Sequence, residues 1–260
     1  VRNGVLTREA STLRTGGIHA GGDLTLKVSD GSLLASGRAW DRDAIHLSGT
    51  VMSLDVVDTP KSAFTQVTIG DRATPLVIDA DTLQARTRTA GSSVIALRDI
   101  DNLVINGPGW QGTDINGNAV TVPGGLRIAY DGSMLVRAEG ALEVRGLVEM
   151  SFDPRGTVLL EALDGDLVLD GGSVLMGSGA LSLLASGDII QRGVSSIDNP
   201  NSFSNALGSI DIEAGGSFIQ QTKSRVATRG DKAGPIRIAA QGDIVLSEVD
   251  AGSGGIALMS

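Results

Sequence analysis

Apolar and polar residues alternate with a period of two in short runs along the second half of the chain. The runs belong to a recurring phrase: glycine, apolar residues two and four positions later, glycine eight positions later, Asp or Ser next, and then an apolar residue. Clear copies are Gly124–Met134, Gly179–Ile189, Gly208–Phe218 and Gly234–Ile244, and a weaker copy, longer by one residue, is Gly156–Leu167. Because this alternation is typical of strands with one buried face, each phrase predicts a strand, a glycine corner and a second strand.

The copies recur at intervals typical of repeat proteins. Their second glycines stand at positions 132, 165, 187, 216 and 242, which gives steps of 33, 22, 29 and 26 residues, and self-similarity at about 20 to 50 residues indicates a repeat architecture. One such unit cannot bury its apolar face alone, but units stacked in parallel about 4.8 Å apart can. The pattern therefore predicts an all-β fold, a right-handed parallel β-helix (β-solenoid), with glycines at corners that need positive φ or close approach.

The phrase G-x-[IL]-x-[IL]-x-A-x-G-[DS]-[IF] is clearest at Gly208–Phe218 and Gly234–Ile244. It resembles the haemagglutinin-type repeats of large filamentous adhesins from Gram-negative bacteria, including those exported by two-partner secretion. The resemblance covers residues 124–260 well and residues 1–123 in patches. It implies a secreted, elongated protein whose shaft is structural and not enzymatic.

Composition favours narrow stacked coils over a thick globule. Glycine contributes 36 of 260 residues and aromatic residues only 3%, so the core must be built from Leu, Ile, Val and Ala. At about 25 residues per coil, the chain would form roughly ten irregular coils and a rod about 50 Å long. We expect one continuous solenoid, with irregular coils and loop insertions over residues 1–123 and more regular coils over residues 124–260.

The inward apolar side chains of the regular copies should hold the stack together. Equivalent side chains are expected to pile up inside the coils, so that Ile210 and Ile236 lie over one another. The residues expected to carry the core are Leu126, Ile128, Leu181, Leu183, Ile210, Ile212, Ile236 and Ile238.

Four stretches interrupt the repeat and predict loops or bent coils. Residues 58–75 contain two prolines, and residues 107–118 are dense in Gly, Asn and Pro. Residues 192–207 and 222–233 are two further long excursions. Insertions in a solenoid leave from its corners and often gather on one face, where binding tends to occur.

Charge and the absent residue types narrow the classes of function. The chain has 21 basic and 30 acidic residues, a net charge of −9, with the acidic groups scattered, which argues against nucleic acid as a partner. It has no cysteine, which excludes disulfides and thiolate metal sites. No apolar run approaches the 18 or more residues of a membrane span. The ends show neither a signal peptide nor a completed phrase, so we expect an excerpt of a longer protein.

Two histidines, His19 and His46, each follow an inward isoleucine and should point outward. They are 27 residues apart, about one coil, so they could lie side by side about 4.8 Å apart and share a metal ion or titrate together. Because no cysteine and no third ligand stand in register, the sequence favours two solvated histidines, and we predict no metal site.

Carboxylates near turns could offer oxygen ligands to Ca²⁺. None of the groups matches an EF-hand loop, and the nonapeptide of calcium-binding β-rolls is absent, so turn chemistry explains them equally well. We therefore predict no cofactor, with weak calcium binding left open. These groups are Asp164, Asp166 and Asp170, Asp41 and Asp43, and Asp99 and Asp101.

Parallel β-helices also include polysaccharide lyases and glycosidases, which need two or three carboxylates on one outer face. Asp79 and Asp81 share a strand face, and Arg86 and Arg88 follow downstream. Sugar sites also use exposed aromatic rings, and few aromatic residues are placed to serve. These are Trp40, Trp110 and Tyr130.

We therefore expect a structural and interaction module, namely a shaft segment of a large secreted, adhesin-like protein at the bacterial cell surface. It should not be an enzyme, and we assign it no catalytic, cofactor-binding or metal-binding residues. Its expected partners are other segments of the same long chain, glycans or proteins on host or neighbouring cells, or further copies through lateral self-association. The alternatives are a carbohydrate-active enzyme, lyase or glycosidase, on a parallel β-helix, and a laterally assembling surface-layer or sheath component.

Overall fold

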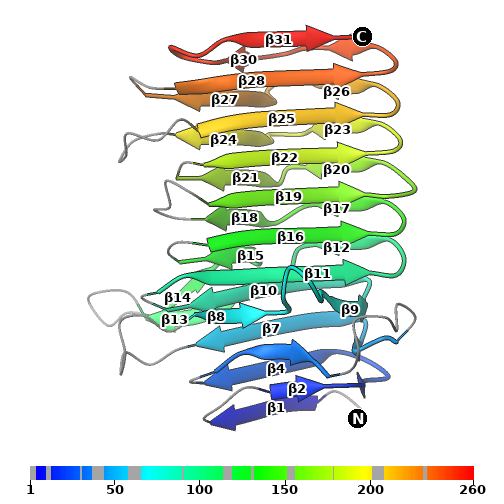
Figure 1. Cartoon of the computed structure of the whole chain (residues 1–260), viewed down its shortest axis with the longest axis vertical. Coiled ribbons are helices and arrows are strands. Elements are labelled where there is room, and N and C mark those ends of the chain that lie inside the picture. The colour runs from blue at the N-terminus through cyan, green and yellow to red at the C-terminus, as the bar shows by residue number, and fades with distance from the viewer. Residues whose placement is uncertain are drawn as a thin grey trace.

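The chain forms a stack of coils that climbs along one axis, with the N-terminus at one end and the C-terminus at the other (Figure 1). As the chain climbs, the nearer strands run from left to right and the farther strands run back, so the coil is right-handed. Every regular element in the described residues is a β-strand. The right-handed parallel β-helix that the repeat predicts is confirmed. The computed structural model describes residues 4–9, 13–29, 31–36, 44–57, 66–89, 91–113, 119–129, 132–150, 156–177, 179–200, 208–230 and 233–260.

Ten parallel strands form a ladder, the front sheet, that faces the viewer in Figure 1. Ten rungs agree with the predicted roughly ten coils. One residue of each strand lies in a single register column, namely Leu13, Leu33, Ile69, Ile95, Met134, Val158, Leu181, Ile210, Ile236 and Ile256. The strands are β2 (Leu13–Thr15), β5 (Leu33–Ala35), β8 (Val67–Ile69), β11 (Ser93–Asp99), β16 (Gly132–Ala138), β19 (Thr157–Ala162), β22 (Ala180–Ala185), β25 (Gly208–Ala214), β28 (Ala233–Ala240) and β31 (Ile256–Met259).

The back of the stack is one 16-stranded sheet, which is undivided in the lower coils and splits above β10 into two arms, called the right arm and the left arm. The lower strands are β1 (Gly4–Glu9), β4 (Leu24–Ser29), β7 (Val51–Val57) and β10 (Thr82–Arg88). The beginning of β10 pairs with the right arm and its end pairs with the left arm. The right arm contains β12 (Leu103–Ile105), β17 (Leu142–Val144), β20 (Leu167–Asp170), β23 (Ile189–Arg192), β26 (Phe218–Gln220) and β29 (Ile244–Val245). The left arm contains β15 (Gly125–Ile128), β18 (Leu147–Met150), β21 (Ser173–Met176), β24 (Ser196–Pro200), β27 (Arg225–Arg229) and β30 (Val249–Asp250).

In the lower coils the front of the stack is divided into pairs of short strands. β3 (Ile18–His19), β6 (Leu47–Ser48) and β9 (Leu76–Asp79) pair in order, and both β8 and β9 pair with β11. A turn between β8 and β9 begins at Gly70, where φ is +73° and an added Cβ would lie 2.1 Å from the carbonyl oxygen of Ala96. Of the loop or bent coil predicted over residues 58–75, residues 67–69 form a rung, which agrees with a bent coil and not with a loop, and residues 58–65 lie outside the described part.

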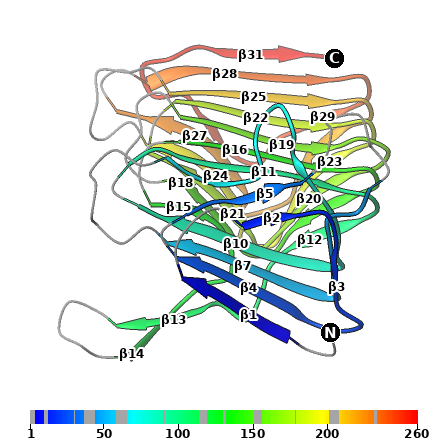
Figure 2. The same cartoon turned by 60° about the horizontal axis from the view of Figure 1, so that its bottom comes forward.

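The predicted loop over residues 107–118 is also partly wrong. It contains β13 (Trp110–Thr113), which pairs antiparallel with β14 (Ala119–Val122). The hairpin extends away from the coils (Figure 2). Residues 107–109 precede β13 without forming a strand, as expected, residues 114–118 lie outside the described residues, and the paired strands were not expected.

All eight residues expected to carry the core are buried, and Ile210 lies opposite Ile236 in register. Leu126 and Ile128, however, belong to the left arm and not to the front sheet. Gly132 was expected to be the second glycine of a copy, at the corner that follows a front-sheet strand. It is instead the first residue of the front-sheet strand β16, in which Met134 stacks beneath Val158. The copy over residues 124–134 was misassigned because a left-arm strand has the same period-two alternation as a front-sheet strand.

Each upper coil has a third strand that the phrase did not reveal. The predicted excursions over residues 192–207 and 222–233 contain β24 and β27. Their buried positions include Asn199 and Thr228, which are opposite each other in register. Polar residues at inward positions hide the apolar alternation on which the sequence prediction depended.

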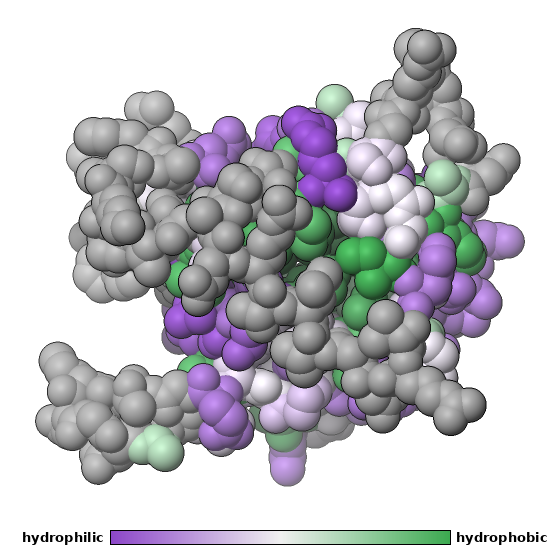
Figure 3. Space-filling view, turned by 90° about the horizontal axis from the view of Figure 1, so that it is seen from below, coloured by the Kyte–Doolittle hydropathy of each residue, from purple (hydrophilic) through white to green (hydrophobic). Residues whose placement is uncertain are grey.

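The hydrophobic core runs along the axis of the stack. Seen from the N-terminal end, described hydrophobic residues are visible near the middle and hydrophilic ones toward the rim (Figure 3). One contiguous cluster of buried apolar side chains extends from Leu13 to Ala251. The upper and lower coils therefore share one core.

Connections of unequal length lie at one corner, between the left arm and the front sheet. Three residues separate β21 from β22, whereas seven separate β24 from β25. At the corner between the front sheet and the right arm, three or four residues join the strands in each coil from β16 upward. The corner between the front sheet and the right arm is therefore nearly constant in length, and the corner between the left arm and the front sheet varies. The hairpin leaves from the third corner, between β12 and β15.

Candidate functional site

The constant corner is closed by side chains that bond from one coil to the next. The backbone N–H of Asp188 donates to Asp166 Oδ1 (2.8 Å), that of Ser217 to Asp188 Oδ1 (2.6 Å), and that of Asp243 to Ser217 Oγ (3.1 Å). Lower in the same column, the N–H of Ala141 donates to Asn102 Oδ1 (2.7 Å). We call these six residues the corner column. It explains why the repeat requires Asp or Ser after its second glycine.

The glycine before each of these residues has a steric reason. An added Cβ at Gly216 would lie 2.1 Å from Asp188 Oδ1, and one at Gly187 would lie 2.3 Å from Asp166 Oδ1. The carboxylate from the coil below occupies the space that a side chain would need. Close approach, and not positive φ, therefore fixes the second glycine at these two positions.

Ion pairs join successive coils on the outer faces. Arg137 and Glu161 are register partners and form a pair, and Arg192 bonds to Asp170 (3.2 Å) in the rung below and to Glu143 (3.2 Å) two rungs below. These pairs are partly exposed, so each contributes less than about 1 kcal/mol to stability. Their value here is geometric, since each pair holds two rungs in one register.

One ion pair is buried, beneath the hairpin. Asp55 Oδ2 lies 2.8 Å from Arg86 Nη2 and 3.1 Å from Arg88 Nη2, and the Arg86 guanidinium lies 4.2 Å from the ring centre of Trp110. Burial acts to raise the pKa of Asp55, but the hydrogen bonds and charges of Arg86 and Arg88 outweigh it and hold the pKa below its ordinary value. Gln84, two residues before Arg86 in β10, donates from Nε2 to Ser53 Oγ (2.8 Å) and accepts the N–H of Gly109 at Oε1 (3.1 Å).

Sequence reasoning missed Asp55. It lies in β7, whose sequence alternates only from Met52 to Val56, and Arg86 follows 31 residues later, directly opposite in register. A charged residue whose opposite charge recurs one coil later is the signal that would have found the pair. That signal requires the length of the coil, which the irregular first half of the sequence does not reveal.

Asp99 is a buried carboxyl at an inward position. Its Oδ1 accepts the N–H of Ala80 (3.1 Å) and its Oδ2 accepts the N–H of Asp101 (3.0 Å). Burial raises its pKa to about 7, the charges of Asp79 and Asp101 add to the effect, and the two backbone hydrogen bonds oppose it. Both oxygens of Asp99 are therefore engaged with the backbone and face away from solvent.

The histidines do not form a pair. His19 is exposed and lies opposite Ser48, with 2.9 Å between Nδ1 and Ser48 Oγ. His46 is buried, and its Nδ1 accepts the N–H of Val77 (3.0 Å). The expectation of two solvated histidines is wrong for His46. The register step here is 29 residues, and not the 27 that would align the two rings.

The carboxylates considered for calcium have separate partners. Asp166 belongs to the corner column, Asp170 pairs with Arg192, and Asp164 is exposed. Asp99 turns inward while Asp101 is exposed. Asp41 and Asp43 lie outside the described residues. Within the described ranges, no three His, Asp or Glu side chains form a group that could hold a metal ion.

The residues considered for sugar chemistry are divided between two places. Asp79 and Asp81 line a small pocket of about 300 Å³ with Ser48 and Thr50. Arg86 and Arg88 bond to Asp55 instead. The predicted grouping of two carboxylates with two arginines is therefore not formed.

Of the three aromatic residues considered for sugar binding, the described one is buried. Trp110 is only 6% exposed and lies against Arg86, so the exposed platform expected there is absent at that residue. Trp40 and Tyr130 lie outside the described residues.

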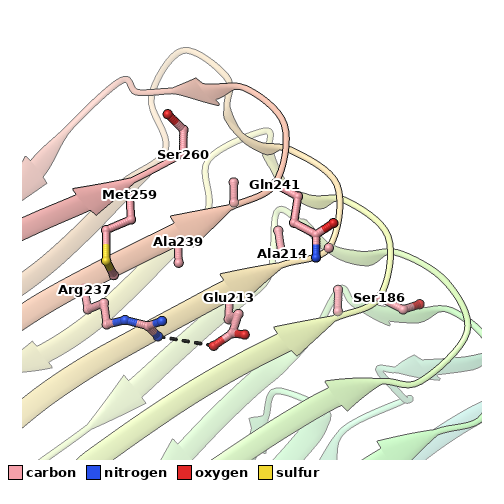
Figure 4. A pocket seen from close by; sticks show the side chains of 11 residues that line it. Ser186, Glu213, Ala214, Arg237, Ala239, Gln241, Met259 and Ser260 are labelled. Carbon is pink, nitrogen blue, oxygen red and sulfur yellow. Dashed lines mark hydrogen bonds and ion pairs between the residues drawn. The ribbon is translucent and has the colours of Figure 1, made fainter.

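A wider groove of about 610 Å³ lies over the upper end of the front sheet (Figure 4). Arg237 and Glu213 lie on neighbouring strands of its lining, with 3.3 Å between Nη1 and Oε2. Arg237 also bonds to Asp211 (2.6 Å). The remaining labelled side chains are small, polar or thioether groups. The groove therefore presents paired charges and no nucleophile with an adjacent base.

Comparison of the chain with models of protein families, with curated proteins and with solved structures gave no match. In the part of the chain that the structure describes, no helix has the length and apolar character of a membrane span.

Proposed function

We propose that this chain is a shaft segment of a large secreted bacterial surface protein of the adhesin type, with a structural and not a catalytic role. The observation that carries the proposal is the register column of the front sheet, which continues through ten rungs from Leu13 to Ile256. Ten rungs at about 4.8 Å give a rod roughly 45 Å long. A rod of this kind separates whatever lies at its two ends.

The contacts between coils suit a protein that bears load. Each rung pairs with its neighbours through parallel strands, and several upper rungs are also joined by the corner column and by outer ion pairs such as Arg137–Glu161. Nearest-neighbour contacts of this kind add up along a solenoid. Connections of unequal length at one corner would display segments to glycans or proteins on host or neighbouring cells, as loops on a rigid scaffold commonly do.

Single-molecule force spectroscopy tests the shaft role. Pulled from its two ends, the chain should unravel in successive events, each of which releases about one coil, or roughly 80 Å of extended chain. A single event that releases the whole chain at low force would contradict a load-bearing rod.

A panel of acidic and neutral polysaccharides separates this role from that of a lyase or glycosidase. We expect no new reducing ends and no unsaturated products after prolonged incubation. Product formation that is lost in Asp79→Asn or Asp81→Asn would contradict the structural role and identify the small pocket as an active site.

A further inference from the structure

The outer face of the lower back strands is polar at nearly every position. β4, β7 and β10 are successive register partners, and their inward residues belong to the core. The alternate residues therefore lie on the outside, in three rows of three. We call these nine residues the outer grid, and Val57 is its one apolar member. The rows are Thr25, Lys27 and Ser29, then Ser53, Asp55 and Val57, then Gln84, Arg86 and Arg88.

The outer grid carries three cations and one carboxylate. Both arginines bond to the same oxygen of the central Asp55, and Lys27 has no ion-pair partner among the described residues. One carboxylate cannot neutralise three cations, and counting Glu9 in the rung below still leaves an excess of positive charge. The rung above adds none, since Arg127 pairs with Glu149. The grid is therefore opposite in sign to the chain as a whole, whose net charge is −9.

The three cations of the grid differ in what remains free for a ligand. Arg86 donates from Nε and Nη2 to the two oxygens of Asp55 (2.9 and 2.8 Å), lies against Trp110 and is 11% exposed. Arg88 uses Nη2 for its bond to Asp55 (3.1 Å), and its side chain is 50% exposed. Lys27 is also exposed. The cations that a ligand can reach are therefore Lys27 and Arg88.

We propose that the outer grid binds an acidic polysaccharide through the carboxylates of its sugar rings. Lys27 and Arg88 lie two rungs, or about 10 Å, apart along the axis, so two acidic groups of one polymer contact them together. The planar guanidinium of Arg88 matches the geometry of a carboxylate. Thr25 and Ser29, on either side of Lys27 in β4, are partly exposed and offer hydroxyl groups to the sugar ring.

The character of the face favours a glycan over an acidic peptide. A peptide that binds a sheet commonly adds a strand to an unpaired edge, whereas β4, β7 and β10 are each paired on both sides. Peptide and protein contacts also depend on apolar anchors, and Val57 is the one apolar side chain of the grid. Nucleic acid is bound through many phosphate contacts, and two exposed cations supply few. The face is away from the unequal corner, so this inference goes beyond the proposed shaft role and does not depend on it.

Isothermal titration calorimetry with an oligomer of galacturonic acid tests the site. The wild-type chain should bind it, and the affinity should fall as salt is added, because exposed charges are screened. Lys27→Gln with Arg88→Gln should weaken binding on the order of tenfold. The matched control, Lys223→Gln with Arg145→Gln, removes two exposed cations elsewhere and should bind nearly as well as the wild type. No binding by the wild type overturns the proposal, and so does equal weakening in the two double variants.

Two further ligands test the chemical class. The methyl ester of the same oligomer has no charged carboxylates and should not bind. Polyglutamate of equal charge should bind more weakly than the galacturonic acid oligomer, because it has no ring hydroxyls for the polar side chains of the grid. Equal binding of either ligand would overturn the assignment to an acidic glycan.

Nuclear magnetic resonance of the wild-type chain locates the contact without any substitution. On addition of the oligomer, the backbone amide signals that shift should belong to β4, β7 and β10. Shifts confined to the front sheet would overturn the assignment to the outer grid. A rod that binds no acidic glycan leaves the proposed shaft role intact, since its parallel rungs do not involve the ligand.

Discussion

Asp99 lies directly beneath Ala138 in the front sheet, at an inward position that the coils above fill with alanine. The column continues through Ala162, Ala185, Ala214 and Ala240. A carboxyl here lies between Ile78 below and the methyl group of Ala138 above, which accounts for its burial and its raised pKa.

Stability should fall as the pH rises because of Asp99. Its pKa is about 7 in the folded chain and near 3.8 when unfolded, so folding takes up a proton between these values. The stabilisation is complete below about pH 4 and is lost as the pH rises through 7, a change on the order of 4 kcal/mol. Urea unfolding at several pH values measures it.

The matched variants for this prediction are Asp99→Asn and Asp164→Asn. A side-chain amide cannot ionise, so Asp99→Asn should remove the slope between pH 4 and 7 and be more stable than wild type at pH 8. Asp164 is exposed, and its variant should keep the slope. An unchanged slope in Asp99→Asn would contradict this assignment of the titrating group.

Asp55 should act in the opposite direction. Its pKa is lowered in the folded chain, so its contribution is present above its unfolded pKa and is lost as the pH falls through the folded value. At pH 7, Asp55→Asn should destabilise the chain by about 3–5 kcal/mol, since Arg86 is left without its counterion in a buried place. Arg127→Gln, at a more exposed pair, should cost less than about 1 kcal/mol. If chemical denaturation gave equal losses of unfolding free energy for Asp55→Asn and Arg127→Gln, burial of the Asp55 pair would have no effect on stability.

Ile212 should be among the most sensitive core positions. It is fully buried and stacked between Leu183 and Ile238. Ile212→Ala should cost about 2–5 kcal/mol, and Ile212→Asp should cost more because it buries an unpaired charge. Ala257→Asp, at an exposed position opposite Arg237, is the control and should be nearly neutral in thermal melts. Near-unchanged melting of Ile212→Asp would rule out this register.

The corner column has one gap that can be filled. Ala141 stands between Asn102 and Asp166 in the column but has no side-chain acceptor. Ala141→Asn should add an acceptor for the coil above and stabilise the chain by about 0.5–1 kcal/mol. Conversely, Asp188→Ala should destabilise it by about 1 kcal/mol, and Asp188→Asn by less, since one acceptor oxygen remains. A lower melting temperature for Asp188→Asn than for Asp188→Ala in calorimetry would contradict a hydrogen-bonding role.

The sequence predicted the front sheet and the right arm above residue 156. The two features of the phrase, the alternation of apolar residues and the glycine corner, each have a physical cause. Inward apolar residues such as Ile210 alternate with outward polar ones. At the corner, Asp188 lies so close to Gly216 that a larger residue does not fit at that position. Where the apolar alternation or the glycine corner is missing from the sequence, the prediction failed. The left-arm strands β24 and β27 were missed because Asn199 and Thr228 replace apolar residues inside the coil.

The contacts between distant residues could not be predicted, because they depend on register. His19 and His46 do not align, because the register step there is 29 residues and the histidines are 27 residues apart. Asp55 lies opposite Arg86 only because the register step at that coil is 31 residues. Register in turn depends on connections whose length follows no rule in the sequence. The candidate surfaces on the outside of the rod were therefore less predictable than its core.

The connections of unequal length between the left arm and the front sheet have an evolutionary consequence. Insertions and deletions between Pro200 and Gly208 change neither the rung below nor the rung above, since both strand ends are fixed by pairing with their neighbours. Such a chain can therefore acquire or lose a surface segment at one height without a compensating mutation elsewhere. It is also a suitable host for grafted peptides, whose spacing along the rod would be set in multiples of one rung.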